Sequence, residues 1–151
     1  MVVLVGAAGC QLVFPVEGSS CPEAYDRIGT ATGARYRVST EPAIWDEAVV
    51  ACAAEGTPDA PTRLVVVSGT DELAEVSSFA SGFIAWIGLH QVGTRWIWIG
   101  AGAPEDFPPQ GPGAPWGDGK PDANGNCVRL EGGELYNQGC ANRYVPICEC
   151  E

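Results

Sequence analysis

The sequence predicts an α+β domain. Three observations support this prediction. Two segments have helical periodicity, several short runs of aromatic and branched residues suit strands, and one long segment has neither helical nor strand periodicity. In chain order they give strand, helix, short strand, helix and then short strands joined by loops, which is an α+β order. With 151 residues and no internal repeat, the chain fits one domain plus a short leader.

The first strand and the first helix are predicted early in the chain. Residues 35–38 alternate polar and apolar side chains, as a strand with one buried face does. A helix should begin around Pro42, with Thr40 or Glu41 as its cap, and end near Gly56. Four of its residues fall at i, i+3, i+4 and i+7 and should share the buried face: Trp45, Ala48, Val49 and Cys52.

A second helix should run from Thr70 to about Ala80, after a short extended segment at 64–67. Ser68 or Thr70 can cap its first turn. The inward side chains of this helix should be those of Leu73, Val76 and Ala80. Three acidic residues lie toward its positive N-terminal end: Asp71, Glu72 and Glu75.

Two apolar runs, 86–89 and 95–98, follow as short strands joined by a connection that contains glycine. The 28 residues from 99 to 126 show neither period. A loop of that length inside a compact domain is usually functional or disordered. Trp116 within this loop favours order, so we expect a functional loop.

Charge and cysteine content restrict the partners and the compartment. The net charge of −11 opposes binding to nucleic acid or to anionic bilayers, so neither is expected as a partner. Seven cysteines in so short a chain indicate an oxidising compartment and disulfides. A zinc site is the alternative, but Cys148 and Cys150 are only one residue apart and His90 is the sole histidine.

The N-terminus resembles that of a bacterial lipoprotein precursor, because residues 7–10 (Ala-Ala-Gly-Cys) resemble the lipobox. The resemblance implies a signal peptide at 1–9, a lipid on Cys10 and, since Gln11 follows, an outer-membrane lipoprotein. Residues 1–9 lack a basic n-region and are shorter than the usual 15 to 30 or so, which leaves the true start codon open. The alternative is an apolar N-terminus with a spare thiol. Residues 10–20 then form a tether, and the domain spans 21–151.

From residue 21 onward, the landmarks resemble the C-type lectin-like domain in order and spacing. They are Tyr36, 45–48 leading to Cys52, 86–89, 96–98, Trp116 with Gly119 and Pro121, 127–128, Cys140 and 145–149. The resemblance implies a compact fold of two helices with small antiparallel sheets, a long loop region and adjacent termini. It also implies disulfides, whereas the six cysteines alone admit many pairings. The implied pairs are Cys52–Cys148 and Cys127–Cys140, which leave Cys21 with Cys150.

In sugar-binding members of that family, the long loop and the following strand hold a calcium ion. The resemblance places the ligand positions on Lys120, Asp122, Gly125, Tyr136 and Asn137. Calcium needs roughly 6 to 8 oxygen ligands, and only Asp122 and Asn137 remain to supply them. We therefore expect no calcium at this site. Either the Lys120 ammonium replaces the ion and pairs with Asp122 and Asn137, or it points into water, as most lysines do.

Other loop residues are further ligand candidates. Glu105 and Asp106 could support an auxiliary calcium ion, although a solvated acidic turn is the commoner outcome. Asp118 adds a carboxylate near the site. Phe107 and Tyr136 are the better aromatic candidates for touching a ligand, because rigid rings stack on sugars and dominate protein interfaces, although burial is the commoner outcome for each.

These observations predict a recognition module and not an enzyme. His90 follows a buried strand, and no base and nucleophile can be named. We expect an extracytoplasmic domain, anchored by lipid or secreted, that binds protein or glycan through the long loop without calcium. One alternative is a weak calcium-dependent carbohydrate-binding lectin, and another is a structural component of a cell-surface assembly.

Overall fold

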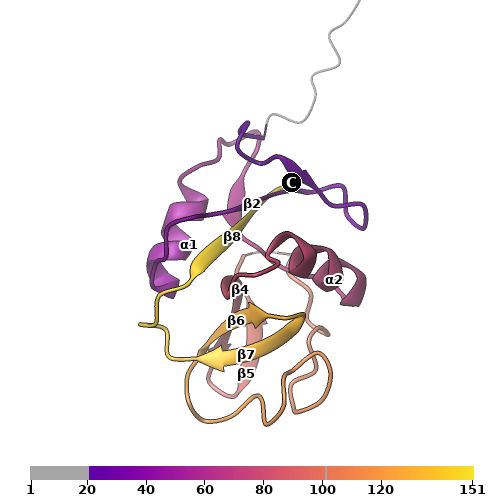
Figure 1. Cartoon of the computed structure of the whole chain (residues 1–151), viewed down its shortest axis with the longest axis vertical. Coiled ribbons are helices and arrows are strands. Elements are labelled where there is room, and N and C mark those ends of the chain that lie inside the picture. Colours follow the sequence, from indigo (N-terminus) through magenta and orange to yellow (C-terminus); the bar gives the residue numbers. More distant parts are fainter. Residues whose placement is uncertain (1–20, 101) are drawn as a thin grey trace, which may run out of the picture.

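The computed structural model of the protein describes residues 21–100 and 102–151, and within them it has the predicted α+β architecture (Figure 1). The helices are α1 (Trp45–Ala53) and α2 (Thr70–Phe79). The strands are β1 (Arg27–Ile28), β2 (Arg35–Val38), β3 (Thr62–Leu64), β4 (Ala85–Val92), β5 (Arg95–Trp98), β6 (Cys127–Glu131), β7 (Glu134–Gln138) and β8 (Val145–Cys150).

The strands form one mixed sheet in the order β1-β2-β8-β4-β6-β7, with β3 added beside β8 and β5 beside β4. Every strand pair is antiparallel except β4–β8. This short parallel contact, at Ala85 and Trp86, joins two antiparallel groups. In Figure 1, α1, β2 and β8 occupy the upper part of the molecule, and β4 to β7 with the long loop occupy the lower part.

Two clusters of buried side chains hold the helices onto the sheet. Leu73 and Val76 of α2 pack in the larger cluster, which also contains the tryptophans of β5. Trp45, Ala48 and Cys52 of α1 pack in the second cluster, as their spacing predicts, while Val49 is half-buried at its edge. Burying a large apolar side chain contributes about 1.5 to 3 kcal/mol, so these faces account for the docking of both helices.

Three disulfides are present: Cys52–Cys148 and Cys127–Cys140, which the family resemblance implies, and Cys21–Cys150, the pair that these two leave. They close sequence separations of 129, 96 and 13 residues. The first disulfide brings the beginning of the described chain next to its end, so that the two lie together in Figure 1.

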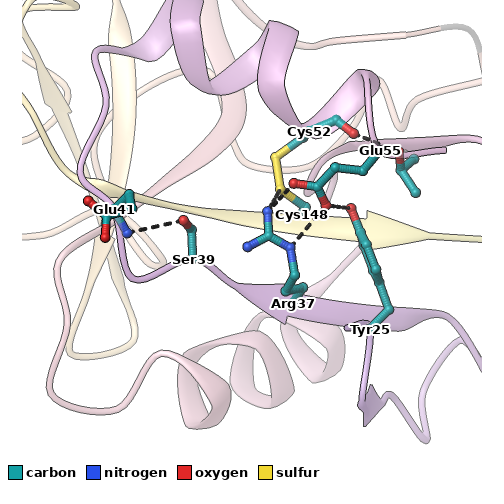
Figure 2. The surroundings of a disulfide bond; sticks show 8 residues. Tyr25, Arg37, Ser39, Glu41, Cys52, Glu55 and Cys148 are labelled. Carbon is teal, nitrogen blue, oxygen red and sulfur yellow. Dashed lines mark hydrogen bonds and ion pairs between the residues drawn. A yellow bond between two sulfur atoms is a disulfide. The ribbon is translucent and has the colours of Figure 1, made fainter. Parts of the chain in front are cut away.

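A polar cluster covers the Cys52–Cys148 disulfide (Figure 2). Arg37 donates from Nε to Glu55 Oε2 at 2.9 Å, and the Tyr25 hydroxyl donates to the same oxygen at 2.7 Å. Arg37 Nη2 also lies 3.7 Å from the Cys148 Sγ atom. Tyr25 is completely buried, and burial raises the pKa of its hydroxyl. The cluster therefore satisfies buried polar groups around a disulfide that is itself fully buried.

The expected helix caps are wrong. Helix α1 begins at Trp45, later than a cap at Thr40 or Glu41 would place it, because Ala43 exchanges both backbone hydrogen bonds with Tyr144 and stays extended. Gly69, not Ser68 or Thr70, is the N-cap of α2.

The carboxylate of Glu72 explains the difference at α2. It accepts hydrogen bonds from the backbone N–H and the hydroxyl of Ser68, at 2.7 and 2.6 Å. It also accepts one from the buried Tyr36 hydroxyl at 2.7 Å. Glu72 is thus a buried link between α2 and β2 and not an exposed charge at the helix end. Neither described helix has the length and apolar character that a membrane span requires.

Candidate functional site

The long loop between β5 and β6 is held in place by tryptophans. Trp98 donates from its indole to the carbonyl oxygen of Phe107 at 2.6 Å, and Trp116 donates to that of Pro109 at 2.8 Å. The rings of Trp96 and Trp116 lie 5.1 Å apart. A buried indole normally finds a hydrogen-bond acceptor, and here the acceptors are loop carbonyls. The described part of the loop is therefore ordered, as Trp116 predicted.

Lys120 does not point into water. Its ammonium donates to Asp122 Oδ2 at 2.9 Å and to the backbone carbonyl of Asn137 at 3.2 Å. The side chain of Lys120 is only 15% exposed. The sequence left two possibilities for Lys120, pairing or exposure to water. In the structure its ammonium pairs with the side chain of Asp122 and the backbone carbonyl of Asn137.

The Asp122 carboxylate is bonded on both oxygens. In addition to the Lys120 bond, Oδ1 accepts from the backbone N–H of Asn124 at 2.9 Å, and Oδ2 accepts from its Nδ2 at 2.7 Å. The Lys120 ammonium, followed by the Asn124 donors, holds the pKa of Asp122 well below its usual range. Asp122 is thus an ionised carboxylate whose charge is already matched inside the protein.

Asn137 lies beneath this pair and fastens the loop to β7. It is fully buried, its Oδ1 accepts from the Asp122 N–H at 3.0 Å, and its Nδ2 donates to the carbonyls of Asp122 and Gly125 at 2.9 and 2.8 Å. Each polar atom of the carboxamide is therefore used within the protein. Asn137 positions the site and presents no free oxygen to a ligand.

Gly125 occupies the position of the acidic ligand and can accept no side chain. Its φ of +146° is one that L-residues rarely adopt, and a Cβ there would lie 2.0 Å from the carbonyl carbon of Gln138. The carbonyl of Gly125 is also the acceptor for Asn137. The backbone of β7 therefore excludes a carboxylate from this position.

The residues at the family's calcium position do not fit calcium. The ion prefers roughly 6 to 8 oxygens, several of them anionic, whereas one carboxylate is present and a cation already neutralises it. Glu105 and Asp106 are both exposed on the loop. Across 21–100 and 102–151, no three or more His, Cys, Asp or Glu side chains gather in a way that could hold a metal ion.

Tyr136 belongs to a stack that the sequence did not reveal. The guanidinium carbon of Arg129 lies 4.7 Å from the centre of the Tyr136 ring and 5.6 Å from that of Tyr144. The Tyr136 hydroxyl donates to Glu134 at 2.6 Å, a bond that raises its pKa. Arg129 and Tyr136 are register partners on β6 and β7, so a correct strand alignment would have placed them together. The three stacked side chains are half-buried, and the Tyr136 ring lies against Gly117, whose carbonyl accepts from the backbone N–H of Lys120.

The other predicted site residues are scattered. Phe107 is half-buried against the larger core cluster and anchors the loop, and Asp118 is exposed. His90 stacks on Trp45 with 4.9 Å between ring centres, and burial lowers its pKa. The described cysteines are all in disulfides. Within the described residues, His90 therefore has no cysteine thiol to activate.

The sequence profile of the family described as Lectin C-type domain matches residues 41–150. The chain belongs to the C-type lectin family. Domains of this family serve as recognition modules for glycans or proteins, generally without enzymatic activity, and those with disulfides are typically extracellular or secreted.

Solved C-type lectin structures share this fold. The lectin CEL-I from Cucumaria echinata superposes with a TM-score of 0.70 at 20% identity, covering 87% of this chain and 98% of that one. Human lithostathine superposes with a TM-score of 0.68 at 25% identity, covering 85% of this chain and 98% of that one. The carbohydrate-recognition domain of cow CD23, solved in the presence of a GlcNAc2Man3 oligosaccharide, gives 0.70 at 24% identity, covering 87% and 96%. A comparison with curated protein sequences finds no match.

Proposed function

We propose that this C-type lectin domain is an extracytoplasmic recognition module that binds protein or glycan through its long loop, without calcium at the sugar site. One observation carries the proposal: the Lys120 ammonium lies between Asp122 Oδ2 and the Asn137 carbonyl, at 2.9 and 3.2 Å. A cation supplied by the chain thus neutralises the carboxylate that would otherwise attract the ion.

Electrostatics and coordination both support this reading. A calcium ion on Asp122 would have to share the carboxylate with the Lys120 ammonium, and two like charges this close repel each other. Asn137 uses its oxygen on the Asp122 N–H, and Gly125 offers no carboxylate. Ligands would then be bound by direct contacts of the loop and the adjoining strands, and not through a metal.

Calcium titration tests the proposal. Calcium at millimolar concentration should give no calorimetric heat of binding and no change in melting temperature, because a ligand stabilises a protein only by binding its native state. A glycan array should give the same signals with and without a chelator.

The opposite result would support a calcium-dependent lectin. The melting temperature of the wild-type protein would rise by several degrees with calcium, and Asp122→Ala would abolish that rise. A rise that survives Asp122→Ala but disappears in Glu105→Ala/Asp106→Ala would place the ion at those loop acids. If no soluble ligand is found, chemical crosslinking on intact cells tests the structural alternative.

The proposed location includes a lipid anchor on Cys10. This residue and the predicted segments 1–9 and 10–20 lie outside the described residues, so the lipobox pattern alone supports the anchor. Mass spectrometry of the natural protein should find a mature N-terminus at Cys10 that carries lipid. An unmodified Cys10, or a chain that still begins with Met1, would exclude the bacterial outer-membrane lipoprotein.

A further inference from the structure

Strand β5 has a strand neighbour on one edge only, within the described residues. It pairs with β4, and a side chain covers part of its other edge. Gln110 of the long loop accepts from the backbone N–H of Trp96 through Oε1 at 2.7 Å, and its Nε2 donates to the carbonyl of Trp96 at 3.0 Å. The carboxamide of Gln110 thus makes both hydrogen bonds that a residue of a neighbouring strand would make.

The edge continues beyond Gln110. Along a strand, the N–H and C=O groups of alternate residues point to the same side. The N–H and C=O of Trp96 point to Gln110, on the side away from β4. The N–H and C=O of Trp98, two residues further, therefore also point away from β4. The Ile99 N–H, one residue further, bonds back to Gly88 at 2.9 Å, which agrees with this alternation.

An open trough lies between β5 and the start of the long loop. Its volume is about 240 Å³, one wall is β5 from Arg95 to Trp98, and the other is the loop at Gly100 and 102–105. Side chains of successive strand residues point to opposite faces, so a trough that four successive residues line must contact backbone as well as side chains of β5. Arg95 and Glu105 add one charge of each sign to the trough walls.

The geometry of this edge selects a particular ligand chemistry. The N–H and C=O of Trp96 point the same way, so a ligand must offer an acceptor and a donor side by side. An extended peptide residue does so, and so does a primary carboxamide such as that of Gln110. The N-acetyl group of an amino sugar does not, because a trans amide directs its N–H and C=O to opposite sides. Sugar hydroxyls can also donate and accept, but an extended peptide repeats the pair at every second residue and so matches the spacing from Trp96 to Trp98.

We propose that the β5 edge binds an extended polypeptide segment of a partner protein, which adds as a strand after displacing the Gln110 carboxamide. Main-chain hydrogen bonds supply affinity in this mode of recognition. Gln110 protects the edge when no partner is bound, as covered edges do in other sheets. This inference rests on the proposed recognition function and identifies protein as the ligand class.

The test uses the isotope-labelled full chain and the peptide acetyl-Thr-Val-Thr-Val-amide as probe. Millimolar peptide should shift the backbone amide resonances of Trp96 and Trp98. The same peptide methylated on its backbone nitrogens, and N-acetylglucosamine, should leave them in place. Gln110→Ala removes the internal competitor and should tighten peptide binding about tenfold, as expected for the loss of competing neutral hydrogen bonds.

Two variants complete the experiment. Gln110→Glu keeps an acceptor for the Trp96 N–H but cannot donate to its carbonyl, so its affinity should lie between wild type and Gln110→Ala. Gln138→Ala removes a carboxamide from β7 and should leave the affinity unchanged. Gln110→Ala loses both hydrogen bonds to Trp96 and should therefore melt a few degrees below wild type, while circular dichroism of the same samples verifies that it still folds.

Strand addition is wrong if the peptide shifts neither tryptophan amide in wild type and Gln110→Ala, or if both proteins bind it equally well. In that case, the Gln110→Ala variant is tested on glycans and proteins in the presence of a chelator. If it still binds one of them, the proposed function holds but the β5 edge is not the binding site. Absence of any such binding, together with a silent β5 edge, would reject both.

Discussion

Glu149 accepts a hydrogen bond on Oε1 from Arg63 Nε at 2.6 Å while only 1% of the residue is exposed. The same oxygen accepts from the backbone N–H of Val66 at 3.1 Å. Burial raises the pKa of Glu149 to about 7, and Arg63 opposes that rise. The carboxyl group therefore titrates in the folded protein near neutral pH.

The first prediction concerns this titration. From pH 4.5, the ordinary carboxyl pKa, to about pH 7, the folded state retains a proton that the unfolded state has lost. The free energy of unfolding should therefore fall as pH rises through this window, by at most about 3 kcal/mol. Glu149→Gln cannot titrate and should abolish this contribution, as measured by denaturant unfolding at several pH values.

Wild type must be compared with Glu149→Gln, because titration of His90 changes the free energy of unfolding with pH in the opposite direction. Burial lowers the pKa of His90, so its contribution to stability increases with pH up to its ordinary value of 6.5. This contribution is common to both proteins and cancels in their difference. Parallel pH profiles for wild type and Glu149→Gln would show that Glu149 titrates at its ordinary pKa.

The second prediction concerns the Lys120–Asp122 pair. Lys120→Met keeps the apolar stem and removes the ammonium, so the pKa of Asp122 should rise toward its ordinary value of 3.8. In wild type, the lowered pKa of Asp122 stabilises the folded protein above pH 3.8, and this stabilisation is lost as pH falls through the folded-state pKa. Lys120→Met has little of this stabilisation, so its free energy of unfolding should fall less on acidification. A carboxyl carbon titration by NMR measures the shift, and an unchanged pKa would mean that the Asn124 donors alone hold it down.

The third prediction tests whether Asn137 holds the loop. Asn137→Ala removes three buried hydrogen bonds and should cost about 3 kcal/mol of stability in denaturant unfolding. The exposed Asn142 is the matched control, and its alanine variant should stay within about 0.5 kcal/mol of wild type. Equal effects at both positions would contradict a positioning role.

The fourth prediction separates steric exclusion from backbone conformation. Gly125 and Gly119 both have positive φ, at +146° and +70°, but only Gly125 has β7 backbone where its Cβ would be. Gly119→Ala should cost about 1 kcal/mol. Gly125→Ala should cost several times more or prevent folding, and similar melting temperatures for the two variants would show that the loop can move away from β7.

The fifth prediction ranks two disulfides. In the chain-entropy model, removing Cys52–Cys148, with a separation of 96 residues, costs about 4.7 kcal/mol, while removing Cys127–Cys140, with a separation of 13, costs about 3 kcal/mol. Double alanine variants and denaturant unfolding measure both. The reverse order would indicate that local packing, and not chain entropy, dominates. Non-reducing peptide mapping should identify all three pairs.

The sequence predicts the elements that depend on spacing alone. The apolar positions of α1 and α2 and the alternation in β2 specify buried faces, and those residues are buried in the structure or lie at the core edge. The helix caps were wrong because distant partners decide them. Tyr144 keeps Ala43 extended, and Tyr36 and Ser68 draw Glu72 inward.

The candidate site could be predicted only in part for the same reason. The types of Lys120, Asp122 and Gly125 were enough to argue against calcium. The burial of Asn137 and the Arg129–Tyr136 stack depend on how β6 and β7 pair across their turn. Gln110 carries no pattern of its own, and its role depends on a strand edge that exists only after folding.

The Cys21–Cys150 disulfide has a mechanical consequence. It joins the two ends of the described domain, whose Cα atoms lie 5.9 Å apart there. Tension applied between residues 21 and 151 would pass through this covalent bond and would not reach the sheet. In single-molecule pulling, the oxidised domain should release no contour length, whereas after reduction the strands would bear the load and unfold with a measurable extension.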